Sequence, residues 1–157
     1  MARVLVVGVS GDDTSVAACE WVVEHVYRPG DELHLIHIVP RSDPSQGPIV
    51  APGDLVARRN PSEYDHAVEG AEKFIAQRLL PVLAVLTTDP VVHLIKSEMD
   101  TDSIGGVLCR KADGLGAALL LVSSHTKSKV TEFFVGSVCS YCTHNSKVPV
   151  IVHKRSL

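Results

Sequence analysis

Short apolar runs alternate with helical segments along this chain, and that alternation limits the possible folds more than any other feature. The runs are rich in Val, Leu and Ile and have no regular apolar–polar alternation, which is typical of strands buried on both faces of a parallel sheet. We expect strands at residues 3–9, 32–39, 91–97, 117–123 and 148–154. Strands that alternate with helices predict an α/β fold, a three-layer sandwich around a five-stranded parallel sheet.

Helices are expected in the intervening segments. The first begins at Asp12, Asp13 or Thr14 and the third at a cap on Thr101 or Asp102. A long helix over 61–80 begins with Pro61, and Pro81 kinks or ends it. The last covers 136–145. The core-facing residues predicted from helical spacing are Val16, Cys19, Val23 and Val26 in the first helix, with Trp21 and Val22 widening that stripe, Val68, Ala71, Phe74 or Ile75, and Leu79 in the second, and Ile104, Val107 and Leu108 in the third.

Length and composition predict one domain over residues 1–157. The chain has 157 residues, of which 45% are hydrophobic, and a formal net charge of -3. Nucleic-acid-binding proteins usually carry a net positive charge, which this chain does not have. Its apolar runs are too short to span a bilayer. Between Pro40 and Pro61 the composition shifts to proline, glycine and serine, which predicts a long loop inserted at about 40–61. The N-terminal run is interpreted as a strand rather than a targeting segment.

Four cysteines favour a reducing, cytoplasmic location over a disulfide framework, because the core is large enough without one. Cys139 and Cys142 are spaced C-x-x-C, but they fall a few residues into a predicted helix, where positions i and i+3 share one face. We interpret them as two buried thiols. His34, His37 and His93 lie in predicted strands and are interpreted as core or edge histidines rather than metal ligands.

Parallel α/β sheets place their ligands beyond the carboxyl ends of the strands, where the strand order reverses. With the first strand in the centre, the walls of that crevice are residues 10–13 and 123–129. The segment LVSSHTKSKVTEFFVGSV carries small hydroxyl residues and then reaches Gly136-Ser137 at a helix start, where backbone N–H groups can hold a phosphate.

These segments resemble the universal stress protein family. The most specific part is the C-terminal third, with SSHTKSKVTEFFVGSV, a helix and KVPVIVHKR, and the segment WVVEHVYRPGDELHLIHIV resembles plant and algal members. The resemblance implies a Rossmann-like, adenine-nucleotide α-hydrolase-type fold with strand order 3-2-1-4-5. It also implies a homodimer paired through the last strand, at Val148, Val150, Ile151 and Val152. An edge strand leaves backbone groups that such pairing would satisfy.

For a nucleotide site, the resemblance implies a pattern of Gly, two residues, Gly, nine residues, Gly and then Ser or Thr. On this chain the pattern falls on Ser123, Thr126, Gly136 and Ser137, so the spacing is intact although the first two glycines are absent. The family's Asp at the end of strand one is replaced by Ser10, and the adenine-contacting main chain corresponds to Ile38. The full set of predicted nucleotide-binding residues is Val9, Ser10, Ile38, Ser123, Ser124, Thr126, Lys127, Gly136, Ser137 and Val138.

Two functional classes remain open on the sequence. The first is a module that binds ATP or another adenine nucleotide, with or without Mg²⁺, in stress response or signalling. The second is a nucleotide-free dimer with a degenerate site that works as a protein-interaction module with an unknown partner. No Walker-type motif, kinase catalytic loop or Ser-His-Asp arrangement is evident, so we expect at most a slow ATPase. His125, Phe133 and Phe134 receive no assigned role in the site.

Overall fold

The structure is a computed structural model that describes residues 2–39, 61–96, 104–124 and 136–155. The expected Pro-rich loop and the expected helix cap at Thr101 or Asp102 lie outside these residues. The described segments contain all five predicted strands and the four predicted helical regions, in the predicted order.

The five strands form one parallel sheet in the order β3-β2-β1-β4-β5. Their bounds are Val4–Gly8 for β1, Glu32–Val39 for β2, Val91–Lys96 for β3, Leu119–Ser124 for β4 and Val150–Lys154 for β5. The predicted sheet and its strand order are confirmed. Strand β5 begins later than expected, since Val148 and Pro149 precede it, whereas β2 has the expected bounds.

Helix α1 (Asp13–His25) covers one face of the sheet beside β1 and β4. Asp12 caps it, because the Asp12 carboxylate accepts a hydrogen bond from the backbone N–H of Thr14. The predicted core stripe is confirmed in part. Cys19 and Val22 are fully buried, and Val16, Trp21, Val23 and Val26 are partly buried against the same core. The fully buried Ser15 and Ala18 were not predicted. Small side chains at these positions allow the helix to approach the sheet closely.

The long predicted helix continues past Leu80 in three segments: α2 (Pro61–Phe74), the π-helix η2 (Ile75–Leu79) and α3 (Leu80–Leu83). In a regular α-helix the Pro81 ring would meet the carbonyl group of residue 77, and Pro81 has no N–H to donate. The wider π turn comes directly before this proline, and the Leu80 N–H donates to the Ile75 carbonyl group. Ala71, Ile75 and Leu79 are buried as the predicted stripe requires, and Leu83 extends it.

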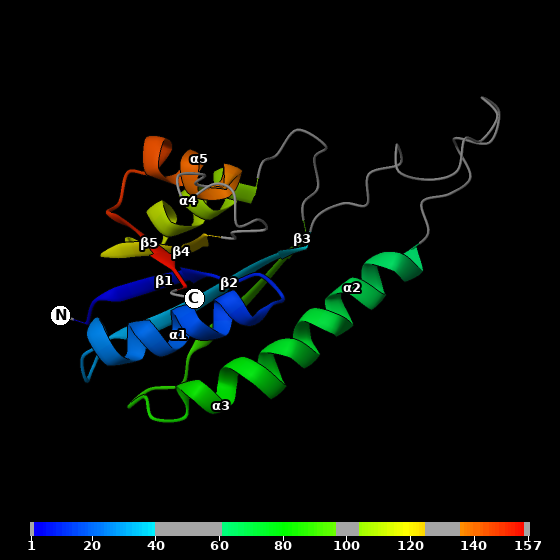
Figure 1. Ribbon diagram of the computed structural model, residues 1–157, viewed down its shortest axis with the longest axis horizontal. Helices are drawn as coiled ribbons and strands as arrows, with labels where there is room; N and C mark the ends of the chain where they lie inside the picture. The colour runs from blue at the N-terminus through cyan, green and yellow to red at the C-terminus, as the bar shows by residue number, and fades with distance from the viewer. Residues whose placement is uncertain (1, 40–60, 97–103, 125–135, 156–157) are drawn as a thin grey trace.

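Helices α4 (Ile104–Gly114) and α5 (Ser137–Asn145) cover the opposite face of the sheet, as Figure 1 shows. Leu108 faces the core as predicted, but Ile104 does not, because its side chain is 37% exposed. Cys139 and Cys142 are buried free thiols, which confirms their interpretation as core thiols. Burial raises the pKa of Cys142 to about 12, so this thiol is protonated at neutral pH.

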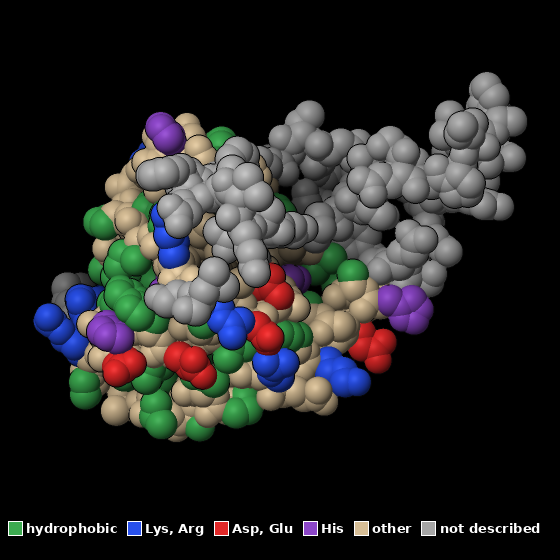
Figure 2. All heavy atoms as spheres, in the orientation of Figure 1, with side chains coloured by type: hydrophobic (Ala, Val, Ile, Leu, Met, Phe, Trp, Pro, Cys, Tyr) green, Lys and Arg blue, Asp and Glu red, His purple; other side chains and the backbone are tan. Residues whose placement is uncertain are grey.

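Acidic and basic side chains are interspersed on the face shown in Figure 2. Within the described ranges, no helix combines the length and apolar character that a membrane crossing requires.

Candidate functional site

A pocket of about 370 Å³ lies at the carboxyl ends of β1, β2 and β4, where the strand order reverses around the central strand β1. Residues from the ends of these strands and from the first turns of α4 and α5 surround it. The lining residues are Gly8, Val9, Ser10, Gly11, Ile36, His37, Ile38, Ile104, Leu108, Val122, Ser123 and Val138. The pocket therefore occupies the position at which parallel α/β sheets bind ligands.

The walls of the pocket are aliphatic. Ile36 and Ile38 come from β2, Val122 from β4 and Leu108 from α4, and all four belong to the core beneath α4 and α5. Gly8 forms part of the floor. A Cβ atom built on Gly8 would lie 3.0 Å from Cδ1 of Leu108, so the absence of a side chain lets α4 pack close to β1. An aliphatic cavity of this kind accommodates a flat apolar group.

Ser10 supplies the polar rim at the end of β1 and is held by a local hydrogen-bond network. The backbone N–H of Ser10 donates to Ser15 Oγ at 2.7 Å, and Ser15 Oγ donates back to the Ser10 carbonyl oxygen at 2.8 Å. The Ser10 hydroxyl lies 3.0 Å from Asp12 Oδ1 and 3.0 Å from Ser15 Oγ. Because Asp12 also caps α1, the start of this helix fixes the orientation of the Ser10 side chain.

Ser123 and Ser124 are the last two residues of β4, and their hydroxyl groups lie in different environments. The Ser123 hydroxyl donates to the Thr14 carbonyl oxygen at 3.4 Å, and the Cys139 thiol donates to the Ser123 carbonyl oxygen at 3.2 Å, so this residue joins α1 to α5. Ser124 is 4% exposed, and its hydroxyl oxygen has no hydrogen-bond partner among the described residues. A buried hydroxyl without a partner is costly, which makes Ser124 Oγ a position where a ligand or a water molecule would be stabilising.

Gly136 is the N-cap of α5 and Ser137 is its first residue, so the helix start predicted at these residues is confirmed within one residue. Ser137 is exposed and Val138, which follows it, lines the pocket. The first N–H groups of α5 thus begin beside the pocket. The predicted site residues Thr126 and Lys127 lie outside the described residues, as do His125, Phe133 and Phe134.

The structure brings five of the predicted site residues to one pocket: Val9, Ser10, Ile38, Ser123 and Val138. Sequence reasoning had placed Gly11 on the wall of the crevice, but it missed the other lining residues, namely Gly8, Ile36, His37, Ile104, Leu108 and Val122. Part of this set had a signal, because Ile36 and Ile38 share one face of a strand and Ile104 and Leu108 are one helical turn apart. His37 is anchored rather than free, since its Nδ1 atom donates to the Val9 carbonyl oxygen at 2.9 Å.

No group of three or more His, Cys, Asp or Glu side chains suited to hold a metal ion occurs in the described part of the chain. The histidines in strands have other neighbours: His37 is bonded to the backbone, and His34 Nδ1 lies 2.9 Å from His93 Nε2.

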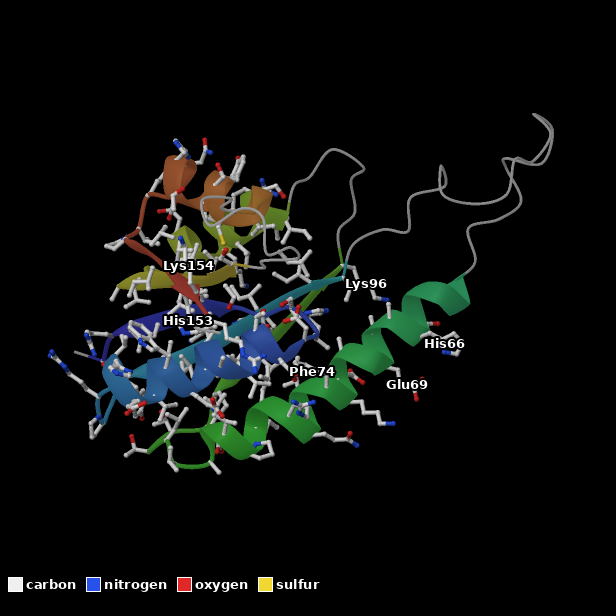
Figure 3. The ribbon with its side chains drawn as sticks, in the orientation of Figure 1. His66, Glu69, Phe74, Lys96, His153 and Lys154 are labelled. Carbon is white, nitrogen blue, oxygen red and sulfur yellow. The ribbon has the colours of Figure 1, made fainter. Side chains whose placement is uncertain are left out.

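Strand β5 is an edge of the sheet, and its predicted interface residues Val148, Val150, Ile151 and Val152 are partly buried. A second hollow of about 380 Å³ lies between α1 and β5 and is lined in part by Trp21 and Ile151. His153 and Lys154 also line this hollow at the carboxyl end of β5, and Figure 3 shows their positions. Trp21 of α1 packs against His153 on this face, and Ile151 is partly buried there, so α1 covers this side of β5 only in part.

Comparison with known proteins identifies relatives over nearly the whole chain. "Universal stress protein PHOS32" of Arabidopsis thaliana is 28% identical over 160 residues, which cover 96% of this chain and 64% of the relative. The chain thus spans less than two thirds of the length of this curated relative.

Solved structures share the fold at low sequence identity. Universal stress protein UspA from Lactobacillus plantarum is 17% identical with a TM-score of 0.71, and the match covers 96% of each chain. A universal stress protein in complex with cAMP is 17% identical with a TM-score of 0.58, covering 98% of this chain and 97% of the other. A universal stress protein from Archaeoglobus fulgidus in complex with dAMP is 15% identical with a TM-score of 0.51, covering 97% of each chain.

The profile of the family described as "Universal stress protein family" matches residues 1–154. With the parallel sheet in the order 3-2-1-4-5, this match places the chain in a known group: the protein belongs to the universal stress protein family.

Proposed function

We propose that this protein is an adenine-nucleotide-binding module, with ATP as its ligand, that acts in stress response or signalling as a homodimer in the cytoplasm. The observation that carries the proposal is the aliphatic pocket at the reversal of strand order, with Ser10 and the start of α5 at its rim. The structural relatives solved with cAMP and dAMP support an adenine nucleotide as the class of ligand.

The residues present fit the parts of such a ligand. The aliphatic walls at Ile36, Ile38 and Leu108 suit a flat purine base, because they remove its apolar faces from water. Ser10 Oγ is placed at the end of β1 to bond a ribose hydroxyl group. The first turn of α5 and the buried hydroxyl of Ser124 offer donors to a phosphate group, which would give Ser124 Oγ the partner that it lacks.

We assign Thr126 and Lys127 to the same phosphate region on the spacing that they share with Gly136 and Ser137. A magnesium ion would enter with a triphosphate rather than through a protein cage. We propose binding rather than rapid turnover, so that the nucleotide biases a dimer or a partner surface and hydrolysis is at most slow.

The homodimer is proposed to form through β5. As an edge of the described sheet it offers unpaired backbone groups, and Ile151 is only partly buried beside the hollow next to α1. Replacing Ile151 by Arg is expected to shift the protein from dimer to monomer in native mass spectrometry. Circular dichroism of the variant would separate a lost interface from a lost fold.

The experiment that tests ligand binding is native mass spectrometry of the purified protein, followed by denaturing release of any bound small molecule. We expect an adenine nucleotide to be released, or to be taken up when Mg-ATP is added to an empty sample. Failure on both counts would refute the nucleotide proposal and select the nucleotide-free interaction module.

A matched pair of variants tests whether this pocket is the site. Ile104 lines the pocket and is 37% exposed, whereas Leu80 lies on α3 away from the pocket and is 39% exposed. Trp at position 104 fills the pocket mouth, so Ile104→Trp is expected to weaken Mg-ATP binding at least about tenfold in calorimetry. Leu80→Trp should leave the affinity unchanged. Equal affinities for the two variants would place the nucleotide elsewhere.

A further inference from the structure

Two histidines join the edge strand β3 to its neighbour β2. His34 Nδ1 lies 2.9 Å from His93 Nε2, and the two rings are nearly parallel, with their planes 17° apart. His34 is 7% exposed, and its other nitrogen, Nε2, is buried without a hydrogen-bond partner in the described part of the chain. The pair lies on the α4 side of the sheet and belongs to neither the pocket nor the β5 edge.

Two charged side chains act on the pair from the elements around it. Glu32, also on β2, places Oε2 3.7 Å from His34 Nε2, and Lys111 on α4 acts electrostatically on His93. Glu32 therefore favours a proton on His34 Nε2, while Lys111 disfavours positive charge on His93.

With both rings neutral, each ring carries one proton, and one of the two facing nitrogens donates to the other. The negative charge of Glu32 favours the arrangement in which His34 keeps its proton on Nε2 and accepts a hydrogen bond from His93 Nε2. This arrangement leaves the buried His34 N–H without a close acceptor, because 3.7 Å is too long for a good hydrogen bond.

One added proton fits the same geometry. A charged His34 donates from Nδ1 to a bare His93 Nε2 and directs its charged Nε2–H toward Glu32, so the contact between the strands is kept. A second proton does not fit. Both facing nitrogens would then carry hydrogens at a separation of 2.9 Å, and two positive rings would lie side by side near Lys111.

Burial, then Lys111 and then His34 lower the pKa of His93 below 6.5. A histidine whose pKa is lower in the folded state stabilises the fold above its unfolded pKa, and that contribution is lost as the pH falls through the folded pKa. The contribution is therefore complete above about pH 6.5 and declines in acid.

We propose that His34 and His93 form a proton-sensitive clamp that accepts one proton without opening and releases strand β3 from β2 when the second proton binds. In the described sheet β3 pairs with β2 alone, so its release leaves the other four strands paired. The clamp would make one edge of this stress-protein fold responsive to acid independently of any nucleotide.

Hydrogen–deuterium exchange followed by mass spectrometry, corrected for the pH dependence of the intrinsic rate, tests the clamp on the full chain. As the pH falls below about 6.5, protection of β3 amides should fall by up to about tenfold per pH unit, while β1 keeps its protection. His93→Gln should flatten this dependence, since an amide can bond to His34 without titrating. If β3 protection changes with pH equally in His93→Gln and in the unmodified protein, the proposal is overturned.

Two controls isolate the pair. His144→Gln changes an exposed histidine on α5. His153→Gln changes a histidine on β5, at the opposite edge of the sheet, whose pKa is also lowered by burial. Both variants should leave β3 exchange unaltered. If His93→Gln does not fold, ¹⁵N imidazole spectra of the unmodified protein decide the question. The His93 signals should titrate over the pH range in which β3 loses its protection, and a loss of β3 protection at a pH where His93 does not titrate would refute the clamp.

Discussion

Replacing Gly105 by Ala should give no gain in stability, although Ala is the better helix-forming residue. Gly105 lies in α4 against α5, and an added Cβ atom would sit 2.9 Å from both Cβ and Cδ1 of Tyr141. Carbon atoms in contact are normally about 3.5–4.0 Å apart, so α4 and α5 would have to separate by roughly half an ångström or more. Tyr141 Cβ is fixed to the backbone, so a rotamer change alone cannot remove the clash.

The magnitude follows from two opposing terms. Ala gains about 1 kcal/mol over Gly in a helix interior, and overpacking a close contact costs about 1–3 kcal/mol. We therefore expect Gly105→Ala to lie between neutral and about 2 kcal/mol destabilising. Gly70 in α2 is the control, because no atom lies within 4 Å of a Cβ built there. Gly70→Ala should gain up to about 1 kcal/mol of stability.

Thermal unfolding followed by circular dichroism measures the pair. At about 2–4 °C per kcal/mol for a domain of this size, Tm should rise by up to about 4 °C in Gly70→Ala and should stay level or fall in Gly105→Ala. The contact also matters for the pocket, since α4 contributes Leu108 and α5 contributes Val138 to its walls. An equal rise in Tm for both variants would show that α4 and α5 are not packed as closely as described.

Three other predictions concern the core and its titrating groups. Leu79→Ala removes a fully buried side chain and should cost about 2–5 kcal/mol in urea unfolding, whereas Leu80→Ala, at a position 39% exposed, should cost much less; similar losses would contradict the π-helical placement of Leu79. Burial raises the pKa of Cys19 from 9.0 to about 12, so the stability that this protonated thiol contributes is lost as the pH rises above about 9. Above that pH the folding equilibrium constant should fall by up to about tenfold per pH unit through this group, and Cys19→Ala should remove that part of the fall. Hydrogen bonds from Arg3 lower the pKa of Asp31 below 3.8, so the stability that the ionised carboxylate contributes is lost as the pH falls through the acid range. Asp31→Asn should make the free energy of unfolding depend less on pH in acid. An unchanged pH dependence would refute the stabilising role of the Arg3–Asp31 contact.

The strands were predictable because burial on both faces leaves a simple sequence pattern. Residues 32–39 were placed correctly from their apolar run alone, and Pro81 indicated the place where the long helix changes its geometry. The order of the strands was not derivable from the runs and came from the family resemblance. The inward faces of the helices were harder to predict. Small residues such as Ser15 and Ala18 bring α1 close to the sheet, whereas the prediction favoured the larger valines.

Part of the pocket was predictable from topology, since the ends of β1 and β4 must flank the reversal of strand order. The contribution of α4 was not. Ile104 was predicted to enter the core, but it is 37% exposed at the pocket, whereas Leu108, one helical turn later, is buried. The hydrogen-bond network around Ser10 also escaped prediction, since it depends on the side-chain positions of Asp12 and Ser15 rather than on spacing.

The resemblance to the family implies an Asp at the end of strand one, where this chain has Ser10. The hydrogen-bond network around Ser10 shows what this substitution changes. Ser15 Oγ donates its hydrogen to the Ser10 carbonyl oxygen, so it can only accept from the Ser10 hydroxyl, and Asp12 Oδ1 is likewise an acceptor. The Ser10 hydrogen is therefore directed into the network, toward one of these two oxygens. What Ser10 presents to the pocket is a lone pair, which has the same polarity as a carboxylate oxygen although it lacks the charge. A ribose hydroxyl could donate to either, so the substitution weakens the contact without reversing its direction.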